Sequence, residues 1–213
     1  MFVGERMSRP VISVSPDEPI NEVLAMFRTE HIRRAPVMKD GKLLGIVSER
    51  DLLNASPSSV TTLSVWELNY LISKVKIKTV MTKKVITVDK DTPIEEAARI
   101  MADQKIGGLP VMSAGKVVGM ITETDLFKTF LELMGARQKA IRVTATVPEQ
   151  PGELAKVTQA ISANGGDFIA FGMFSGPDAH SRVITFKVLG MKKEKIREVL
   201  KDVVLKFWDI RQS

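Results

Sequence analysis

A hydroxyl residue stands three positions before an aspartate at two places in the chain. The two segments are Ser48-Glu-Arg-Asp51 and Thr122-Glu-Thr-Asp125, and each follows an aliphatic run typical of a β-strand. At the first turn of a helix, the hydroxyl accepts from free amides and the acid lies at the positive end of the helix dipole. Capping alone would explain both pairs. The same free amides suit an anionic ligand, and the carboxylate suits the two hydroxyls of a ribose.

Both pairs belong to a segment that occurs twice. Residues 7–52 and 81–126 align without a gap, at a constant offset of 74 positions. A repeated unit often cannot bury its apolar face alone. We therefore expect a pseudo-twofold pair with equivalent clefts between the copies. Residues identical in both copies include Pro19 and Pro93, Pro36 and Pro110, Gly41 and Gly115, and Glu49 and Glu123.

The pattern within each repeat predicts a strand, a helix, a hairpin and a second helix. Ile20, Val23 and Phe27 recur at helical spacing after a proline-rich turn, which is typical of an amphipathic helix. In the first repeat we predict strands at 11–14, 35–38 and 43–47, a helix at 20–30 and a helix that opens at 48. In the second repeat we predict strands at 85–88, 109–112 and 116–121, a helix at 94–104 and a helix that opens at 122 and runs to 134.

The segment between the repeats, residues 54–72, begins as a Ser/Thr/Pro-rich loop. Leu63, Trp66, Leu68 and Leu71 then predict a short helix laid over an apolar surface. We interpret this segment as a packed connector, with a lid over a ligand as the alternative.

After residue 139 the pattern changes to that of a different domain. Alternating residues such as those in 141–147 predict half-buried strands. We predict strands at 141–147, 167–175, 182–189 and 205–210, and helices at 154–163 and 193–203. The order β-α-β-β-α-β is the ferredoxin-like arrangement. The expected fold class is therefore α/β (α+β), with domains at residues 1–74, 75–135 and 140–213.

Composition excludes several classes of protein. The 213 residues are 44% hydrophobic and 26% charged, with no apolar run near the about 18 residues that a membrane span needs. The start of the chain lacks the apolar core of a signal peptide, so we expect a cytoplasmic protein without a membrane segment. The net charge of +6 comes from scattered basic residues, whereas nucleic-acid binding usually shows a concentrated basic stripe.

The sequence offers no catalytic or metal-binding arrangement. It contains no Cys, and its two histidines, His31 and His180, lie in different predicted domains. One histidine per domain does not make a His-based metal site without several carboxylates. There is also no nucleophile–base pair and no phosphate-binding P-loop. We expect no catalytic residues and no metal.

The two repeats resemble CBS domains over residues 1 to about 135. The features that carry the resemblance are the strand and proline-rich turn after Val11, Ala35-Pro-Val37, and Gly45-Ile-Val-Ser48-x-x-Asp51 with its second copy from Gly119. The final segment resembles an ACT domain through its element order and Pro151-Gly152-Glu-Leu154. The whole order is similar to the CBS–ACT proteins often called acetoin-utilisation proteins.

The resemblance implies that the CBS pair binds adenosine compounds: AMP, ADP, ATP or S-adenosylmethionine. Sites in this family are composite, so each aspartate faces a strand from the other repeat. Ser48 and Asp51 would then face Lys84, Val85 and Ile86, and Thr122 and Asp125 would face Pro10, Val11 and Ile12, with the apolar strand edges holding the adenine.

Two further positions are implicated by resemblance. Arg33 and Arg34, with the adjacent Ile32, would lie where CBS proteins often reach ligand phosphates, although both arginines could equally face solvent. Their counterparts are Gly107 and Gly108, so the two sites would be unequal. Gly152 lets the chain turn tightly, and in ACT domains this glycine also lets a small amino acid approach the backbone.

The sequence thus predicts a non-enzymatic regulatory protein that senses an adenosine nucleotide and, at the ACT domain, a small amino acid. The resemblance also implies a homodimer, because CBS pairs associate and ACT sheets pair at their edges. The alternative is a transcription-related regulator that acts through DNA or a DNA-bound partner. Binding of labelled DNA that weakens as salt rises would favour that alternative, because phosphate contacts release counterions.

Overall fold

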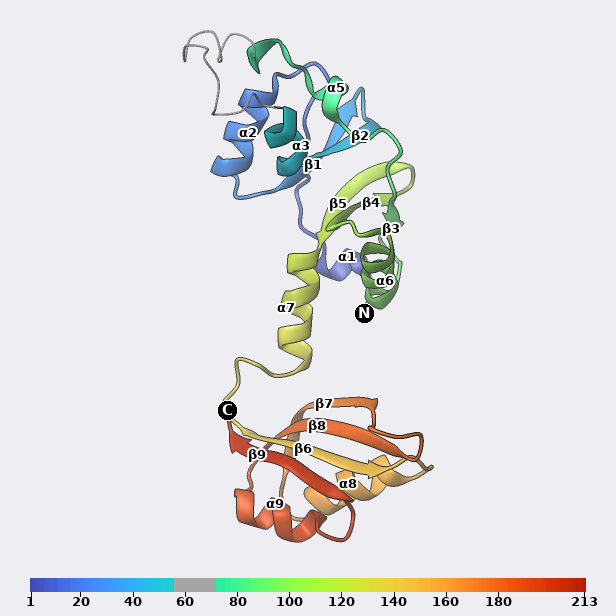
Figure 1. Cartoon of the computed structure of the whole chain (residues 1–213), viewed down its shortest axis with the longest axis vertical. Helices are drawn as coiled ribbons and strands as arrows, with labels where there is room; N and C mark the ends of the chain where they lie inside the picture. The colour runs from blue at the N-terminus through green and yellow to red at the C-terminus, as the bar shows by residue number, and fades with distance from the viewer. Residues whose placement is uncertain (56–71) are drawn as a thin grey trace. The chain divides into compact units, whose positions relative to one another are not determined.

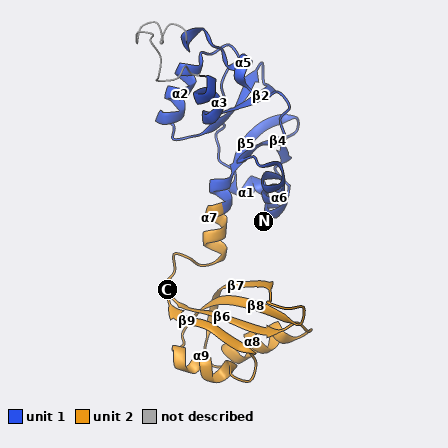
Figure 2. Cartoon of the chain, in the orientation of Figure 1, with its two compact units in different colours: residues 1–126 blue, residues 127–213 orange. Residues whose placement is uncertain are grey.

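The chain divides into two compact units, residues 1–126 and 127–213 (Figure 2). This computed structural model describes residues 1–55 and 72–213. The short helix predicted from Leu63 to Leu71 lies outside the described residues. Within the two described ranges, no helix combines the length and the apolar character needed to cross a membrane.

The first repeat packs two helices on an antiparallel hairpin (Figure 1). The hairpin turn has positive φ at Asp40 and Gly41, 52° and 74°, as a two-residue turn that matches the strand twist requires. The first helix begins directly after Pro19 and buries Val23 and Phe27, because these lie on one face of a 3.6-residue period. The elements are α2 (Ile20–Thr29), β1 (Arg34–Lys39), β2 (Lys42–Ser48) and α3 (Glu49–Ala55).

The second repeat has the same construction. Gly108 pairs with Thr122 across its hairpin, as Arg34 pairs with Ser48 in the first, and both hairpins shift register at the same place. The predicted helix at 94–104 is confirmed with its bounds. The elements are β3 (Val88–Asp89), α6 (Ile94–Gln104), β4 (Gly108–Ser113), β5 (Lys116–Thr122) and α7 (Glu123–Leu133).

The repeats exchange two short helices, α1 (Val3–Arg6) and α5 (Ile77–Val80). Val3, fully buried, packs in the core of the second repeat, whereas Ile77, also fully buried, packs in the core of the first. Figure 1 shows α5 beside β2 and α1 near α6. Each repeat therefore buries its apolar face partly with a helix that precedes the other repeat in sequence.

The strands predicted at 11–14 and 85–88 are only partly formed. In the first segment Val14 alone pairs, with Val37, and in the second the strand is Val88–Asp89. The reason is the exchange: both segments run from one repeat to the other. Each pairs first with the far hairpin, at Ser8–Met120 and Thr82–Ile46, before it reaches its own.

The C-terminal unit is a four-stranded antiparallel sheet with two helices, in the order β7-β8-β6-β9. This order matches a ferredoxin-like domain. Its core lies between the sheet and the helices, where Val143 and Phe186 from strands meet Val157 and Ile196 from helices. The elements are β6 (Ile141–Pro148), α8 (Glu153–Ser162), β7 (Asp167–Ser175), β8 (Ser181–Leu189), α9 (Lys193–Leu200) and β9 (Lys206–Gln212).

A buried lysine of the sheet forms hydrogen bonds with the segment at the start of this unit. Lys187 in β8 is 5% exposed, and its Nζ donates to the backbone oxygens of Gly135 and Gln138, both at 3.0 Å. These carbonyls belong to the segment that follows α7. The Gly135 oxygen also accepts from the Gln138 amide, so the ammonium joins a turn of this segment to the sheet.

We expect Lys187→Met to lower the free energy of unfolding of the C-terminal unit by about 2 kcal/mol, because hydrogen bonds to a charged group are lost while the stem is kept. Urea unfolding measures this change. Lys195→Met is the matched control: its Nζ pairs with Glu198, both side chains are exposed, and exposed pairs contribute little. Equal losses in the two variants would contradict a special role for Lys187.

Candidate ligand site

The two Ser/Thr–Asp pairs form the same local structure. Asp51 Oδ2 accepts from the Ser48 amide at 2.8 Å and from Ser48 Oγ at 2.6 Å. Asp125 Oδ2 accepts from the Thr122 amide at 2.9 Å and from Thr122 Oγ1 at 2.7 Å. The capping role is therefore present in both repeats. In the first repeat, both bonds from Ser48 reach Oδ2 of Asp51, so this cap does not use Oδ1.

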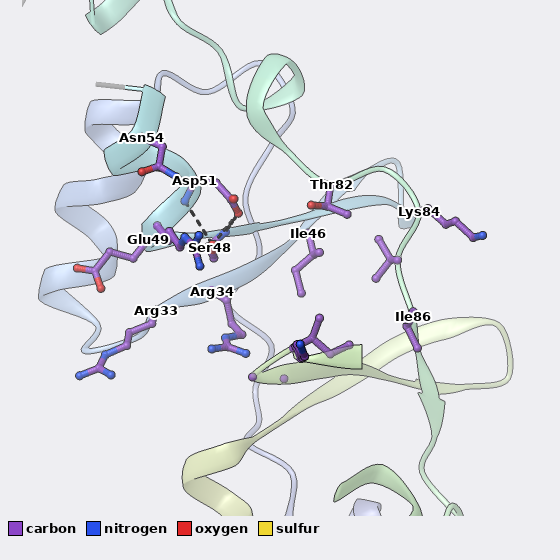
Figure 3. Close-up of a pocket in the computed structure, with 16 residues that line it drawn as sticks. Arg33, Arg34, Ile46, Ser48, Glu49, Asp51, Asn54, Thr82, Lys84 and Ile86 are labelled. Atoms are coloured by element: carbon purple, nitrogen blue, oxygen red, sulfur yellow. Dashed lines mark hydrogen bonds between the residues drawn. The ribbon is translucent and has the colours of Figure 1, made fainter. Parts of the chain in front are cut away.

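The hairpin brings the arginine pair beside this cap. Arg34 is the cross-strand partner of Ser48, and paired residues carry their side chains on the same face of a sheet. The Glu49 amide donates to the Arg33 oxygen at 2.8 Å, which holds the helix start against the strand. Arg33 itself is exposed, and Figure 3 shows its guanidinium turned away from Asp51.

The exchanged segment completes the site. Ile46 and Thr82 share two backbone hydrogen bonds, at 3.0 and 2.9 Å, which bring residues 84–86 past the end of β2. A pocket of about 570 Å³ lies there, within the size range of small-molecule sites (Figure 3). Of the residues assigned to the first site from sequence, the pocket collects Arg33, Arg34, Ser48, Asp51, Lys84, Val85 and Ile86.

The pocket also has lining residues that were not assigned from sequence. Ile32 packs against the core of the first repeat, and its counterpart Ile106 lines this pocket. The pseudo-twofold explains why, because the strand that faces Asp51 comes from the other repeat. The constant offset of 74 could have identified Ile106. Further lining residues that were not assigned are Ile46, Glu49, Arg50, Asn54, Thr82, Lys105, Gly107 and Gly108.

The second set of assigned residues follows the same construction. Ser8 and Met120 share two backbone hydrogen bonds, at 2.8 and 3.1 Å, so Pro10, Val11 and Ile12 follow a pairing with β5, the strand that ends at Thr122. Asp125 is 7% exposed. The pairing thus brings this segment to the strand that carries the second cap, as residues 84–86 are brought to the first.

Arg34 has an unusual environment. Its guanidinium lies over Gly107 and Gly108: a Cβ at Gly108 would stand 2.9 Å from Arg34 Cδ and 3.0 Å from Nη1. Burial lowers the pKa of Arg34, Glu123 opposes this shift, and Arg33 reinforces it. An arginine nonetheless stays charged near neutrality. The glycine pair of the second repeat therefore makes room for the arginine of the first.

The positive charge of the pocket is not repeated at the equivalent positions of the other repeat. Both acidic lining residues, Glu49 and Asp51, have acidic counterparts, Glu123 and Asp125. None of the basic lining residues has a Lys or Arg counterpart. The basic residues Arg33, Arg34, Arg50, Lys84 and Lys105 correspond to Gly107, Gly108, Thr124, Pro10 and His31. The two sites are alike in backbone and acids but differ in positive charge.

In the C-terminal unit, Gly152 is the residue that caps the start of α8. Its φ is 93°, a conformation that favours glycine, and apart from Gly152 and its two chain neighbours no residue lies within 4 Å of the position that a Cβ would take. The backbone at this turn is therefore open to a small molecule. No cluster of three or more His, Asp or Glu side chains suited to a metal ion occurs in the parts of the chain that the structure describes.

Known proteins share the two-repeat unit. An uncharacterised protein of Methanocaldococcus jannaschii is 32% identical over 157 residues, which cover 62% of this chain and 92% of that one. The CBS domain pair of protein MJ0100, solved in complex with 5′-methylthioadenosine and S-adenosyl-L-methionine, is 27% identical, with a TM-score of 0.52 over 65% of this chain and 98% of that one. A Vibrio cholerae protein named as an acetoin utilization protein is 30% identical, with a TM-score of 0.54 over 64% of this chain and 95% of that one.

The sequence model of the CBS domain matches residues 3–58 and 77–132. These ranges begin with the exchanged helices α1 and α5 and each include one Ser/Thr–Asp cap. The match accounts for more than half of the chain and ends at residue 132, one residue before the end of α7. The chain therefore belongs to the CBS-domain family, with a tandem pair followed by a C-terminal α/β region.

Proposed function

We propose that this chain is a non-enzymatic regulatory protein whose CBS pair binds adenosine compounds. The observation that carries the proposal is the pocket in which the Ser48–Asp51 cap of one repeat faces residues 84–86 of the other. The known complex of a CBS domain pair with adenosine derivatives supports the choice of ligand class. The pocket's side chains also divide into groups that suit the three parts of a nucleotide.

Each part of an adenosine nucleotide has chemically matching neighbours in this pocket. Asp51 Oδ1 is outside the cap and suits the ribose hydroxyls, because a carboxylate accepts both. Val85, Ile86 and Ile106 give an apolar lining for the base. The guanidinium of Arg34 suits a phosphate, which it binds in bidentate fashion. AMP, ADP and ATP are therefore the preferred ligands of the first site, and S-adenosylmethionine is a candidate for the second.

Ligand binding would act by shifting a conformational equilibrium of the chain, by no more than the difference in affinity between its two states.

We further propose that the chain acts as a homodimer. Phe127, Phe130 and Leu133 on α7 are 68%, 53% and 62% exposed, and exposed apolar clusters of this kind mark interaction surfaces. Sedimentation velocity tests the oligomeric state with and without AMP.

We also propose that residues 140–213 form an ACT domain that takes a small amino acid at the turn before α8. The ferredoxin-like strand order and the open backbone at Gly152 support this proposal. A screen of the twenty amino acids by thermal shift tests it, because a ligand that prefers the folded state raises apparent stability. A screen without any stabilising amino acid would contradict the ligand assignment and leave the fold unaffected.

The central experiment is calorimetry of the full chain with adenosine, AMP, ADP, ATP and S-adenosylmethionine, with GMP as the control for the base. We expect heat and thermal stabilisation from adenosine compounds and a much weaker response to GMP. If none of the adenosine compounds binds, the proposed function is wrong. If GMP binds as well as AMP, the site reads the ribose and phosphate but not the base.

A further inference from the structure

Arg34 crosses from one repeat to the other. It starts opposite Ser48 in the first hairpin, and its guanidinium lies over the glycine pair that begins the second hairpin. Gly108 is itself the counterpart of Arg34 at the offset of 74 positions. Two equivalent Ser/Thr–Asp sites therefore have one guanidinium at this position, and it reaches residues of both repeats.

The far end of Arg34 meets an acid of the second site. A Cβ at Gly107 would lie 2.5 Å from Arg34 Nη1 and 2.7 Å from Glu123 Oε2, so the guanidinium and the carboxylate are close neighbours. The Glu123 amide donates to the Gly107 oxygen at 3.1 Å, which holds the acid at this place. Glu123 is the first residue of α7 and stands between Thr122 and Asp125. The acid that attracts Arg34 therefore belongs to the second cap.

Resting on the proposed binding of phosphorylated adenosine compounds at the Asp51 site, we propose that Glu123 competes with the ligand phosphate for Arg34 and thereby couples the two sites. A phosphate in the first site draws the guanidinium away from Glu123, because arginine suits bidentate phosphate binding. The Glu123 carboxylate is then no longer neutralised beside Thr122 and Asp125. A second phosphorylated ligand meets this added negative charge and binds more weakly.

The coupling depends on ligand charge. Adenosine has no phosphate that could bind the Arg34 guanidinium. Its binding at one site therefore does not change its affinity for the other. AMP binds in a strong and a weak step, and these are separated more widely than the two adenosine steps. Because the coupling is electrostatic and Arg34 is only partly buried, the separation narrows as salt rises.

The test is calorimetric titration of the full chain with AMP and with adenosine, comparing the wild type with Glu123→Gln. Glu123 does not line the pocket among the described residues, yet its replacement frees Arg34. We expect the strong AMP step to tighten by about fivefold or more, the lower end of typical coupling between sites. The adenosine steps should not change. The weak AMP step should also strengthen, because the opposing carboxylate is gone.

Two further variants make the result specific. Glu95→Gln removes the same charge from an exposed position at the start of α6 in the same repeat, and it should leave both AMP steps unchanged. In an Arg34→Gly background, Glu123→Gln should no longer affect the strong step, because the double-mutant cycle isolates the pair. If Glu123→Gln and Glu95→Gln alter AMP binding equally, the proposed coupling is wrong, whereas the proposed function is unaffected. Absence of AMP binding in the wild type would overturn both.

Discussion

Asp51→Ala is expected to raise the dissociation constant for AMP at the first site by about one to two decades, without weakening the second site. A charge-assisted hydrogen bond contributes roughly 1.5–3 kcal/mol, and each 1.4 kcal/mol is about tenfold in affinity. The carboxylate is placed for this role because Oδ2 is held by Ser48 and Oδ1 is outside the cap. Calorimetry of the full chain measures the change.

The capping role must be separated from the ligand role, because losing a cap costs about 1 kcal/mol of stability. Asp51→Asn separates them: the amide oxygen still accepts from Ser48 while the charge is removed. If Asp51 binds ligand, Asp51→Asn should melt near the wild-type temperature and still bind AMP at least several-fold more weakly. Wild-type affinity in Asp51→Asn would leave the aspartate with a capping role alone.

Asp125→Ala is the matched variant in the other repeat. Its aspartate makes the same two bonds to Thr122, so it loses a comparable cap. It should weaken the second step and spare the first. If Asp51→Ala and Asp125→Ala each weakened both AMP binding steps, the fold would be generally disturbed. That result would contradict the presence of two separate sites.

Ile77→Ala should lower the free energy of unfolding of the N-terminal unit by about 2–5 kcal/mol, the range for truncating a fully buried isoleucine. Ile77 is 0% exposed and packs with Phe27 and Val37 in the first repeat, although it lies at the start of the second in sequence. Denaturant unfolding measures the loss. Thr79→Ala, at an exposed position two residues on, should cost far less.

The helix exchange adds a stronger expectation. α5 completes the core of the first repeat and α1 completes that of the second, so each core depends on a segment that precedes the other repeat in sequence. Hydrogen exchange of Ile77→Ala should therefore speed up in α6 of the second repeat as well as in α2 of the first. Val3→Ala should do the same from the opposite side, with a smaller loss because fewer methyl groups are removed. Faster exchange confined to α2 would show that the repeats unfold independently.

Features that depend on near neighbours were predictable from sequence. The Ser48–Asp51 cap spans three residues, and the hairpin turn at Asp40–Gly41 needs only a local positive φ, so both follow from residue type and spacing. The helix at 94–104 follows from its apolar period. The C-terminal strand order follows from the sequence of elements, because few topologies accommodate that order.

Features that join distant residues required the tertiary structure. The short helices α1 and α5 have four residues each and no period of their own, so their placement in the opposite core has no local signal. The same exchange leaves Val14 as the one pairing position among residues 11–14. It also puts Ile106, a residue of the second repeat that was not assigned from sequence, in the pocket of Asp51.

The arginine pair shows both what the sequence determined and what required the tertiary structure. Sequence comparison of the repeats identified Arg33 and Arg34 as the counterparts of two glycines but left both arginines equivalent. The structure separates them: Arg33 is exposed, whereas Arg34 lies over Gly107 and Gly108 and beside Glu123. A side chain's direction depends on which surface faces it across the pseudo-twofold, and that surface is made by residues more than seventy positions away.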